Sequence, residues 1–322
     1  MTVKDSMKFR PSLVLDLTSP SSSSSSSTDD DDASWRWGQT TYRKGDFSIG
    51  NDFVRLQGRT LSRGQLCRER LDIQGVLGRG NFSTVRRAQW RKKDEEVEEV
   101  AVKQLSLTRT SKKQHAMLLQ ELRTLCLMAS DFLVSLHGAF LREDTIFLVL
   151  ELMDRGSLQD FINLLDVKRL PEELTANIAF QVLAGLTHLH SNQMIHRDLK
   201  PGNILLHSSG KVKLCDFGMT VLNENSMHTT LVGTTKYMAP ERLCAIPYGR
   251  SSDIWSFGMV VRQCISGEEP WQNINSLVEL VVTVEETEMK DLVPPDLDES
   301  LQELLLGCLQ KQAGEFLPML YH

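Results

Sequence analysis

Short apolar runs of strand length come early in the part of the chain that has a globular pattern. They cover Ile73–Leu77, Thr84–Gln89 and Val100–Gln104, and runs of about four to eight such residues are typical of β-strands. A charged stretch, Arg91–Glu99, lies between the last two runs and predicts a solvated hairpin loop. A further apolar run, Ile146–Leu150, predicts another strand.

Helical spacing dominates the later part of the chain. After Pro171, a residue that is favourable in a first helical turn, apolar side chains recur every three or four positions at Leu174, Ile178, Val182, Leu186 and Leu189. This spacing predicts one long helix. The same spacing over Gln114–Met128, carried by Leu118, Leu122 and Leu125, predicts an earlier helix between the strands.

A small hairpin is predicted after the long helix. Its strands are Ile204–Leu206 and Val212–Cys215, and a Ser-Ser-Gly-Lys turn joins them. Because most strands come first and most helices later, the chain is expected to form two lobes of an α+β protein rather than one alternating α/β sheet. No internal repeat is found.

The N-terminal region differs sharply in composition. Residues 19–27 are all serine except Pro20, and four aspartates, 29–32, follow. Such a stretch cannot bury apolar surface, so it predicts a flexible linker. We expect a disordered tail over residues 1–34, an N-terminal extension over 35–70, and a globular domain from about Leu71.

Composition and charge exclude several classes of protein. The 322 residues are 41% hydrophobic and 24% charged, which is ordinary for a soluble protein with a sizeable core. The longest apolar stretch, Phe132–Met153, is interrupted by charges, and the first 17 residues lack a secretory signal, so we expect no membrane segment. Six scattered cysteines without a CxxC pair indicate a reduced intracellular protein. From residue 71 onward the balance is 25 Lys/Arg against 33 Asp/Glu, a poor match to a nucleic-acid binder.

A glycine pair stands at the first predicted turn, in the sequence Gly78-Arg-Gly80-Asn-Phe-Ser83-Thr-Val85. Glycines there would let the backbone approach a phosphate, although a plain hairpin turn gives the same pattern. The dinucleotide-binding fingerprint does not fit, because Ser83 occupies the third glycine position and a strand follows instead of a helix.

Charged residues of three later segments have spacings that suit phosphoryl transfer. Lys103 ends an apolar strand, where lysines usually reach solvent; a buried ammonium would need a carboxylate partner, and Glu121 follows 18 positions later. In residues 196–203, Asp198 can accept a hydroxyl proton, Lys200 can neutralise a phosphoryl group, and Asn203 can coordinate a metal. Asp216, which begins Asp-Phe-Gly, suits a Mg²⁺ ion that bridges phosphates.

With these motifs in this order, the chain from about Leu71 to Leu309 resembles the eukaryotic protein kinases. The resemblance implies a bilobal protein kinase fold with a small β-rich N-lobe (71–153) and a larger helical C-lobe (154–322), and ATP and Mg²⁺ as cofactors. It implies Asp198, Lys200, Lys103 and Glu121 as catalytic residues and Asn203 and Asp216 as metal ligands. Asp253 would brace the catalytic loop. The implied ATP site comprises Leu77, Gly78, Gly80, Val85, Ala101, Lys103, Leu150, Glu151 and Met153.

The segment between Asp216 and Glu241 is similar to that of MAP kinase kinases in its length and its Val-Gly-Thr ending. By that resemblance an upstream kinase would phosphorylate Ser226 and Thr230, and Arg197 would bind the resulting phosphate. The alternative is that both hydroxyls belong to an ordinary solvated loop. Lys44–Gln57 resembles the lead-in strand region of plant and protist MAP kinase kinases.

Near the N-terminus, a short segment resembles the docking peptide by which MAP kinase kinases bind their MAP kinase. It consists of Lys8 and Arg10 followed by Leu13 and Leu15. The basic pair would meet an acidic patch, and the leucines would enter apolar pockets as an extended peptide. A flexible tether behind it would raise the local concentration of the substrate.

The C-terminal end departs from the family pattern. After Glu315 the chain lacks the arginine that would pair with Glu241, so we expect that carboxylate to lack its usual partner and the kinase domain to be truncated. The leading hypothesis is an ATP-dependent MAP kinase kinase that acts on Thr and Tyr of a MAP kinase. The alternatives are a non-catalytic pseudokinase or docking scaffold, and a Ser/Thr kinase with other substrates, which Lys200 also fits. Expected partners are a downstream MAP kinase and an upstream MAP kinase kinase kinase, with no nucleic acid and no membrane. The expected location is the cytoplasm, with the nucleus left open.

Overall fold

The structure is a computed structural model of the chain. It describes residues 41–44, 47–51, 53–57, 59–60, 66, 68–80, 83–93, 95–107, 122, 125–217 and 235–311. The predictions for residues 8–15, Glu121, Ser226 and Thr230 lie outside these ranges. So does most of the predicted helix 114–128, of which Leu122 is buried and residues 125–127 are helical. In the part that is described, no helix is long and apolar enough to cross a membrane.

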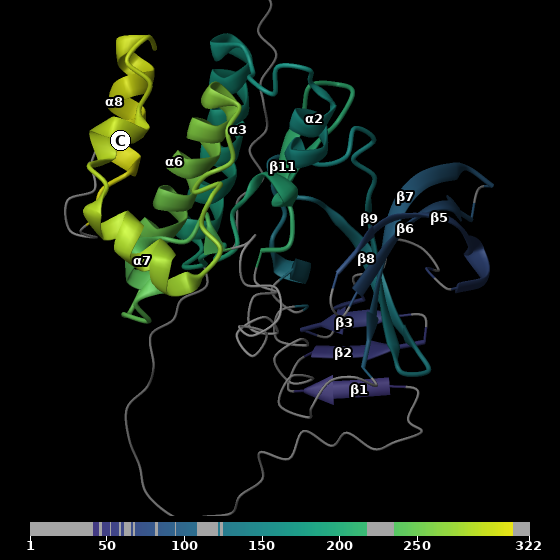
Figure 1. Cartoon of the computed structure of the whole chain (residues 1–322). Helices are drawn as coiled ribbons and strands as arrows, with labels where there is room; N and C mark the ends of the chain where they lie inside the picture. The colour runs from purple at the N-terminus through teal and green to yellow at the C-terminus, as the bar shows by residue number, and fades with distance from the viewer. Residues whose placement is uncertain are drawn as a thin grey trace, which may run out of the picture. The chain divides into compact units, whose positions relative to one another are not determined.

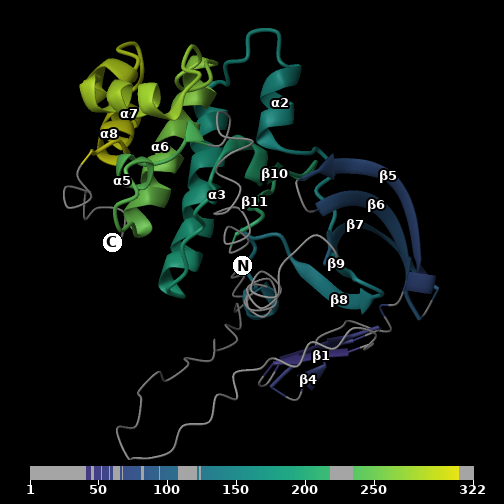
Figure 2. The ribbon, with the colours of Figure 1, turned by 60° about the horizontal axis from the view of Figure 1, so that its bottom comes forward.

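A four-stranded antiparallel sheet precedes residue 71, in the order β1-β2-β3-β4. Its strands are β1 (Thr41–Lys44), β2 (Phe47–Gly50), β3 (Val54–Leu56) and β4 (Arg59–Thr60). Phe47, Ile49, Val54 and Leu56 are buried. Strands β2 and β3 contact β8 of the next sheet. Figure 2 shows this first sheet, labelled at β1 and β4, on the side of β8. The sheet overlaps the region whose sequence implied lead-in strands.

The five-stranded antiparallel sheet that follows has the order β5-β6-β7-β9-β8. A short 3-10 turn, η1 (Arg68–Arg70), leads into it. The strands of the sheet are β5 (Leu71–Arg79), β6 (Ser83–Arg91), β7 (Val97–Ser106), β8 (Leu136–Arg142) and β9 (Thr145–Glu151). All four apolar runs predicted as strands lie inside these elements, so those predictions are confirmed.

The charged hairpin loop is shorter than predicted. Strand β6 runs to Arg91 and β7 begins at Val97, so Arg91 and residues 97–99 belong to the strands and not to the loop. The charges pair across the hairpin instead: Lys92 Nζ lies 2.8 Å from Glu98 Oε2, and Arg87 Nη2 lies 2.6 Å from Glu99 Oε2. Opposite charges facing each other across two strands stabilise the pairing, which is why these polar residues extend the strands.

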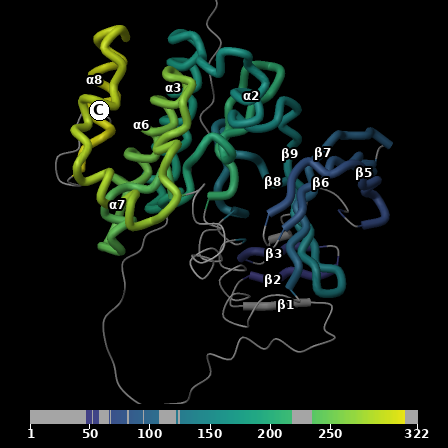
Figure 3. The backbone as a smooth tube through the Cα atoms, in the orientation of Figure 1, coloured from purple at the N-terminus to yellow at the C-terminus, as the bar shows by residue number. Residues whose placement is uncertain are grey.

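The helices gather apart from this sheet, with α6 between α3 and α8 (Figures 1 and 3). The main helices are α2 (Leu158–Leu164), α3 (Glu172–Ser191), α6 (Arg250–Ser266), α7 (Leu277–Glu286) and α8 (Glu299–Cys308). Shorter elements are α5 (Pro240–Leu243), η2 (Pro201–Asn203) and η5 (Met289–Leu292). The predicted α+β arrangement in two lobes is confirmed.

The long helix α3 begins one residue after Pro171 and buries four of the five predicted leucine, isoleucine and valine side chains. The exception is Leu174, which is 38% exposed, while the neighbouring Thr175 is buried. Helix α6 packs against α3, is buried along nearly its whole length and holds the fully buried Trp255. It ends at Gly267, where φ is +74° and the backbone of Lys168 would lie 3.0 Å from a Cβ atom, so glycine is required.

The predicted hairpin consists of β10 (Ile204–Leu206) and β11 (Val212–Leu214), which pair antiparallel. The prediction placed Cys215 in the second strand, but β11 ends at Leu214. Beyond that point Cys215 donates its N–H to the carbonyl of Asn203 at 3.0 Å, and the chain turns at Asp216, where φ is +58°. The hairpin therefore delivers Asp216 beside residues 196–203.

Candidate active site

The loop of residues 196–203, here named the catalytic loop, connects the end of α3 to β10. Two side chains hold the carboxylate of Asp198: Lys200 Nζ lies 2.9 Å from its Oδ2, and Asn203 Nδ2 donates to the same oxygen at 2.9 Å. Asn203 Nδ2 also donates to the main-chain carbonyl of Asp198 at 2.6 Å. The Asp198 carboxylate therefore has a defined position on the catalytic loop.

Asp253 braces this loop from the buried helix α6, as predicted. Its Oδ2 accepts the N–H of His196 at 2.7 Å, and its Oδ1 accepts the N–H of Arg197 at 2.9 Å. Arg197 has φ of +70°, a strained conformation for a residue other than glycine, and these bonds hold it there. The Asp253 side chain is only 2% exposed, so the brace works out of reach of water.

Two histidines complete the brace. His190 Nε2, from the last turn of α3, lies 2.8 Å from Asp253 Oδ2. Sequence reasoning missed His190, whose only signal is its place on the buried face of the predicted helix. Burial lowers the pKa of His196, although the nearby carboxylates of Asp253 and Asp198 oppose this effect. Hence His196 is neutral in the folded protein near pH 7.

Lys103 and Asp216 form an ion pair on the other side of the site. Lys103 is buried on β7, and its Nζ lies 2.5 Å from Asp216 Oδ1. Burial by itself would raise the pKa of Asp216, but the ammonium of Lys103 and its hydrogen bond outweigh burial and lower that pKa below its ordinary value. The carboxylate is therefore charged at neutral pH, and its side chain stays 45% exposed.

The two halves of the site meet at the end of β11. Cys215 is bonded through its N–H to Asn203 of the catalytic loop, and the next residue is Asp216. Burial raises the pKa of the Cys215 thiol well above its ordinary value, so this thiol is protonated. Lys103, Asp198, Asn203 and Asp216 thus converge. Whether Glu121 joins Lys103 lies outside the described residues.

The predicted nucleotide residues lie on the strands above this cluster. Leu77, Gly78 and Gly80 are on or just after β5, Val85 is on β6, and Ala101 is on β7. A Cβ atom at Gly78 would have no protein atom within 4 Å, so the space beside it is open. Leu150 lines a small hollow of about 30 Å³ together with Lys103, Asp216 and apolar neighbours. Met153 is buried just after β9.

Glu151 is arranged differently from the other predicted nucleotide residues. Its carboxylate forms an ion pair with Lys213 of β11 at 2.6 Å, and it accepts the N–H of Ser135 at 2.6 Å. The side chain is thus engaged by protein groups. We call residues 151–153 the hinge. Any contact of Glu151 with a nucleotide would therefore involve the main chain of the hinge and not the Glu151 carboxylate.

The residues present fit a magnesium nucleotide. In the described ranges no three His, Cys, Asp or Glu side chains form a metal cluster, but Mg²⁺ keeps several waters and takes one or two protein oxygens plus phosphates. Asp216 and Asn203 would supply such oxygens, and the N–H of Cys215, the residue before Asp216, donates to the carbonyl of Asn203. When bound, the metal would neutralise phosphate charge.

Next to the catalytic loop lies a second group of charged residues. The guanidinium of Arg242 donates to the carbonyl of Arg197, and both guanidinium groups lie over the ring of Tyr248, at 5.0 and 5.9 Å from its centroid. The expectation that Glu241 lacks its usual arginine partner stays a prediction; among the described residues, the hydroxyl of Ser252 donates to Glu241 Oε1 at 2.5 Å. Neither Arg242 nor Ser252 was singled out from the sequence.

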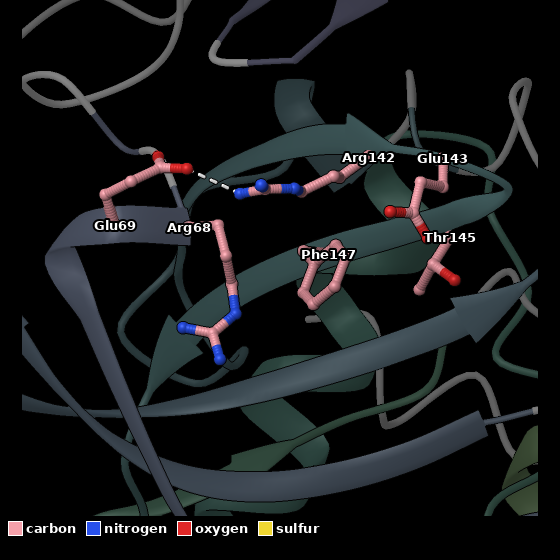
Figure 4. A pocket seen from close by; sticks show the side chains of 6 residues that line it. All are labelled: Arg68, Glu69, Arg142, Glu143, Thr145 and Phe147. Atoms are coloured by element: carbon pink, nitrogen blue, oxygen red, sulfur yellow. Dashed lines mark hydrogen bonds and ion pairs between the residues drawn. The ribbon is translucent and has the colours of Figure 1, made fainter.

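A larger hollow of about 430 Å³ lies away from these residues, between η1 and the β8–β9 hairpin (Figure 4). It is lined by Arg68, Glu69, Arg142, Glu143, Thr145 and Phe147. Glu69 and Arg142 form an ion pair at 2.5 Å across its rim. Two arginines face two glutamates, so the hollow has no excess charge for a phosphate. The charged cluster around Asp198 is therefore the better candidate for a phosphate site.

Comparison with known proteins agrees with this geometry. Residues 71–315 match the protein kinase domain. The chain is 33% identical over 293 residues to the mitogen-activated protein kinase kinase SIPKK of Nicotiana tabacum, covering 84% of this chain and 79% of that protein. It is 35% identical over 297 residues to mitogen-activated protein kinase kinase 2 of Arabidopsis thaliana, covering 84% and 78%. A dual specificity mitogen-activated protein kinase kinase of Caenorhabditis elegans, mek-2, is 37% identical over 207 residues, covering 64% and 52%. The chain therefore belongs to the protein kinase family and, within it, to the MAP kinase kinases.

Proposed function

We propose that this chain transfers the γ-phosphoryl group of ATP to a threonine and a tyrosine in the activation loop of a MAP kinase. The observation that carries the proposal is the convergence of Lys103, Asp198 and Asp216 in a member of the MAP kinase kinases. The Caenorhabditis elegans relative is a dual specificity kinase, which supports transfer to both kinds of hydroxyl.

Each residue of the cluster has a task in this reaction. Asp198 takes the proton of the substrate hydroxyl while that oxygen bonds to the γ-phosphorus, and ADP leaves with the electrons of the broken P–O bond. Lys200 and Lys103 neutralise charge on the phosphates, and Asp216 and Asn203 hold Mg²⁺. Positioning and charge neutralisation supply most of the rate in such reactions.

Phosphorylation of Ser226 and Thr230 by an upstream kinase is the proposed switch. Arg197 supports this part of the proposal, because its guanidinium and that of Arg242 both lie over the half-buried ring of Tyr248, where a phosphate would meet two positive charges. A phosphate in contact with arginines orders a loop through charge-assisted hydrogen bonds.

Lys8, Arg10, Leu13 and Leu15 are proposed to bind the MAP kinase before transfer. Deleting residues 1–18 should raise KM for the MAP kinase and leave ATP turnover unchanged. An unchanged KM would remove the docking role.

We also propose a cytoplasmic location, with the nucleus as a second one. Imaging of the tagged full chain tests this location, and exclusive staining of a membrane-bounded organelle would contradict it.

The decisive experiment uses the full chain with Ser226→Glu and Thr230→Glu and a kinase-dead MAP kinase as substrate. Transfer of labelled phosphate is followed by phosphoamino-acid analysis. The matched control carries the same two substitutions plus Asp198→Asn, which keeps the size of the side chain and removes the base.

Phosphothreonine and phosphotyrosine on the MAP kinase, both absent with the control, are the expected result. Transfer to other proteins without phosphotyrosine would indicate a Ser/Thr kinase with other substrates. No transfer, with binding of the MAP kinase retained, would indicate a docking scaffold.

A further inference from the structure

A buried ion pair connects the hinge to the helical lobe. Lys213 Nζ, from the middle of β11, lies 2.6 Å from Glu151 Oε1 at the end of β9. The two side chains are only 6% and 24% exposed. The same Glu151 oxygen accepts the N–H of Ser135 at 2.6 Å. Three segments far apart in the sequence thus meet at one carboxylate, and we call Lys213, Glu151 and Ser135 the hinge clamp.

Main-chain bonds reinforce the clamp. The segment before β8 runs alongside β11: Leu214 donates its N–H to Phe132 O, and Val134 donates its N–H to Leu214 O, each at 2.9 Å. Glu151 in turn donates its N–H to Ser135 O at 3.0 Å. Residues 132–135 therefore lie between the hinge and β11, bonded to both.

The charge of Glu151 is kept by its neighbours. Burial by itself would raise the pKa of this carboxyl group, but the hydrogen bonds from Lys213 and Ser135 outweigh burial and lower the pKa. A buried lysine needs a charged partner. Substitution of either residue by a neutral one therefore leaves the charge of the other uncompensated.

Lys213 also stands three residues before Asp216 on one short stretch of chain. Cys215, between them, is bonded to Asn203 of the catalytic loop. A nucleotide would lie with its base at residues 151–153 and its phosphates at Asp216. The hinge clamp joins these two ends through Lys213, and its bonds do not involve the space that the nucleotide would occupy.

We infer that Lys213 is a positioning residue, which through Glu151 and Ser135 sets the distance between the base-binding end and the phosphate-binding end of the nucleotide site. It touches neither ATP nor the reacting atoms. The inference rests on the proposed use of ATP and adds a residue outside the nucleotide site. A ligand that spans both ends should need the clamp, whereas a ligand that fills only the base end should need it much less.

The test compares Lys213→Met, which keeps the length of the chain without its charge, Lys213→Arg, which keeps the charge, and Glu151→Gln, which keeps an acceptor for Ser135. Lys211→Met is the matched control, since Lys211 is exposed on the same hairpin. Calorimetry gives Kd for Mg–ATP and for adenosine, and steady-state assays give kcat and KM for ATP with each full-length protein.

We expect Lys213→Met and Glu151→Gln each to raise Kd and KM for Mg–ATP by roughly tenfold, about 1.4 kcal/mol, with a smaller change for adenosine. Lys213→Arg should restore most of the loss, and the double variant should be no worse than either single one. If Lys213→Met does not fold, Glu151→Gln carries the test.

Several results would overturn the inference. A purely structural role would lower the folded fraction and kcat and leave Kd and KM unchanged. A rise in kcat at unchanged KM would show that the clamp restrains the enzyme instead of positioning the site. Equal losses for adenosine and Mg–ATP would show that it acts on the base end alone. Failure of the wild-type protein to bind Mg–ATP would instead refute the proposed function.

Discussion

The two sides of the proposed nucleotide site are built in opposite ways. We call the catalytic loop with Asp253 the floor, and the paired strands β5 and β6 the roof. On the floor, Asp253 accepts the N–H of His196, and the exposed fractions of these two residues are 1% and 0%. On the roof, the pairing of β5 with β6 is irregular on both sides of Val76, and Val76 and Leu77 are 41% and 53% exposed. The floor therefore keeps its geometry through buried bonds, whereas the roof has few protein contacts of its own.

The difference follows from what each side must do. The proposed base, Asp198, has to meet one hydroxyl proton, and a displacement of about 1 Å can cost a factor of 10² in rate. A roof over phosphates has to admit and release a nucleotide, and segments with few buried contacts open at low cost. Substitutions should therefore act mainly on stability when they fall in the floor and mainly on ATP binding when they fall in the roof.

The largest effect is expected for Asp253→Ala. It leaves the N–H groups of His196 and Arg197 without their acceptor, and loss of one member of a buried charged network costs about 3–5 kcal/mol. Leu77→Ala on the roof should cost less than about 1 kcal/mol, because the leucine is largely exposed. Urea unfolding of both variants measures the contrast, and similar losses would refute the buried-floor account.

A smaller effect on stability but a large effect on rate is expected for Lys103→Met. The Asp216 side chain is 45% exposed, so water can solvate it when Lys103 is removed. Loss of a group that stabilises charge in the transition state slows reactions by roughly 10²–10³-fold. Phosphoryl transfer and thermal unfolding should be measured on the same samples. Retained activity would remove Lys103 from the proposed mechanism.

Local patterns were sufficient for the strands, the long helix and the cluster of Asp198, Asn203 and Asp216. Apolar runs and helical spacing report which face of an element is buried, and the motif around Asp198 is contiguous. The hairpin loop at Arg91–Glu99 was predicted too long because charged residues usually signal loops, whereas here they pair across two strands.

Side-chain partners that are distant in sequence could not be predicted. His190 and Asp253 are 63 positions apart, and Glu151 and Lys213 are 62 apart. Glu151 was assigned to the nucleotide from its place in the hinge, yet its carboxylate is bound by Lys213. The hydroxyl of Ser252 on α6 donates to Glu241 on α5, a contact that depends on how two helices pack. Such contacts follow from the fold and not from spacing.

A moderate pH effect is expected from His196 on the floor. Burial lowers its pKa in the folded protein below the ordinary value of about 6.5. As the pH falls through about 6.5 the unfolded chain takes up this proton first, so stability is full above that pH and declines below it. The free energy of unfolding should therefore fall between pH 7.5 and 5.5, and less so in His196→Gln. His207→Gln is the control, because His207 lies on the β10–β11 hairpin with its side chain 37% exposed, and an equal pH dependence of all three proteins would contradict the assignment.

The smallest change is expected from adding one methyl group to the roof. In Gly78→Ala and Gly75→Ala alike, the new Cβ atom on β5 would have no protein atom within 4 Å. Neither should reduce stability, and each can raise it by about 0.4–1 kcal/mol through the unfolded state. Only the methyl group at residue 78 would enter the space assigned to phosphates, so Gly78→Ala should raise KM for ATP several-fold, roughly 1 kcal/mol, and Gly75→Ala should not. Equal KM values in the two variants would place the nucleotide elsewhere under the sheet and leave the open space at Gly78 without a ligand.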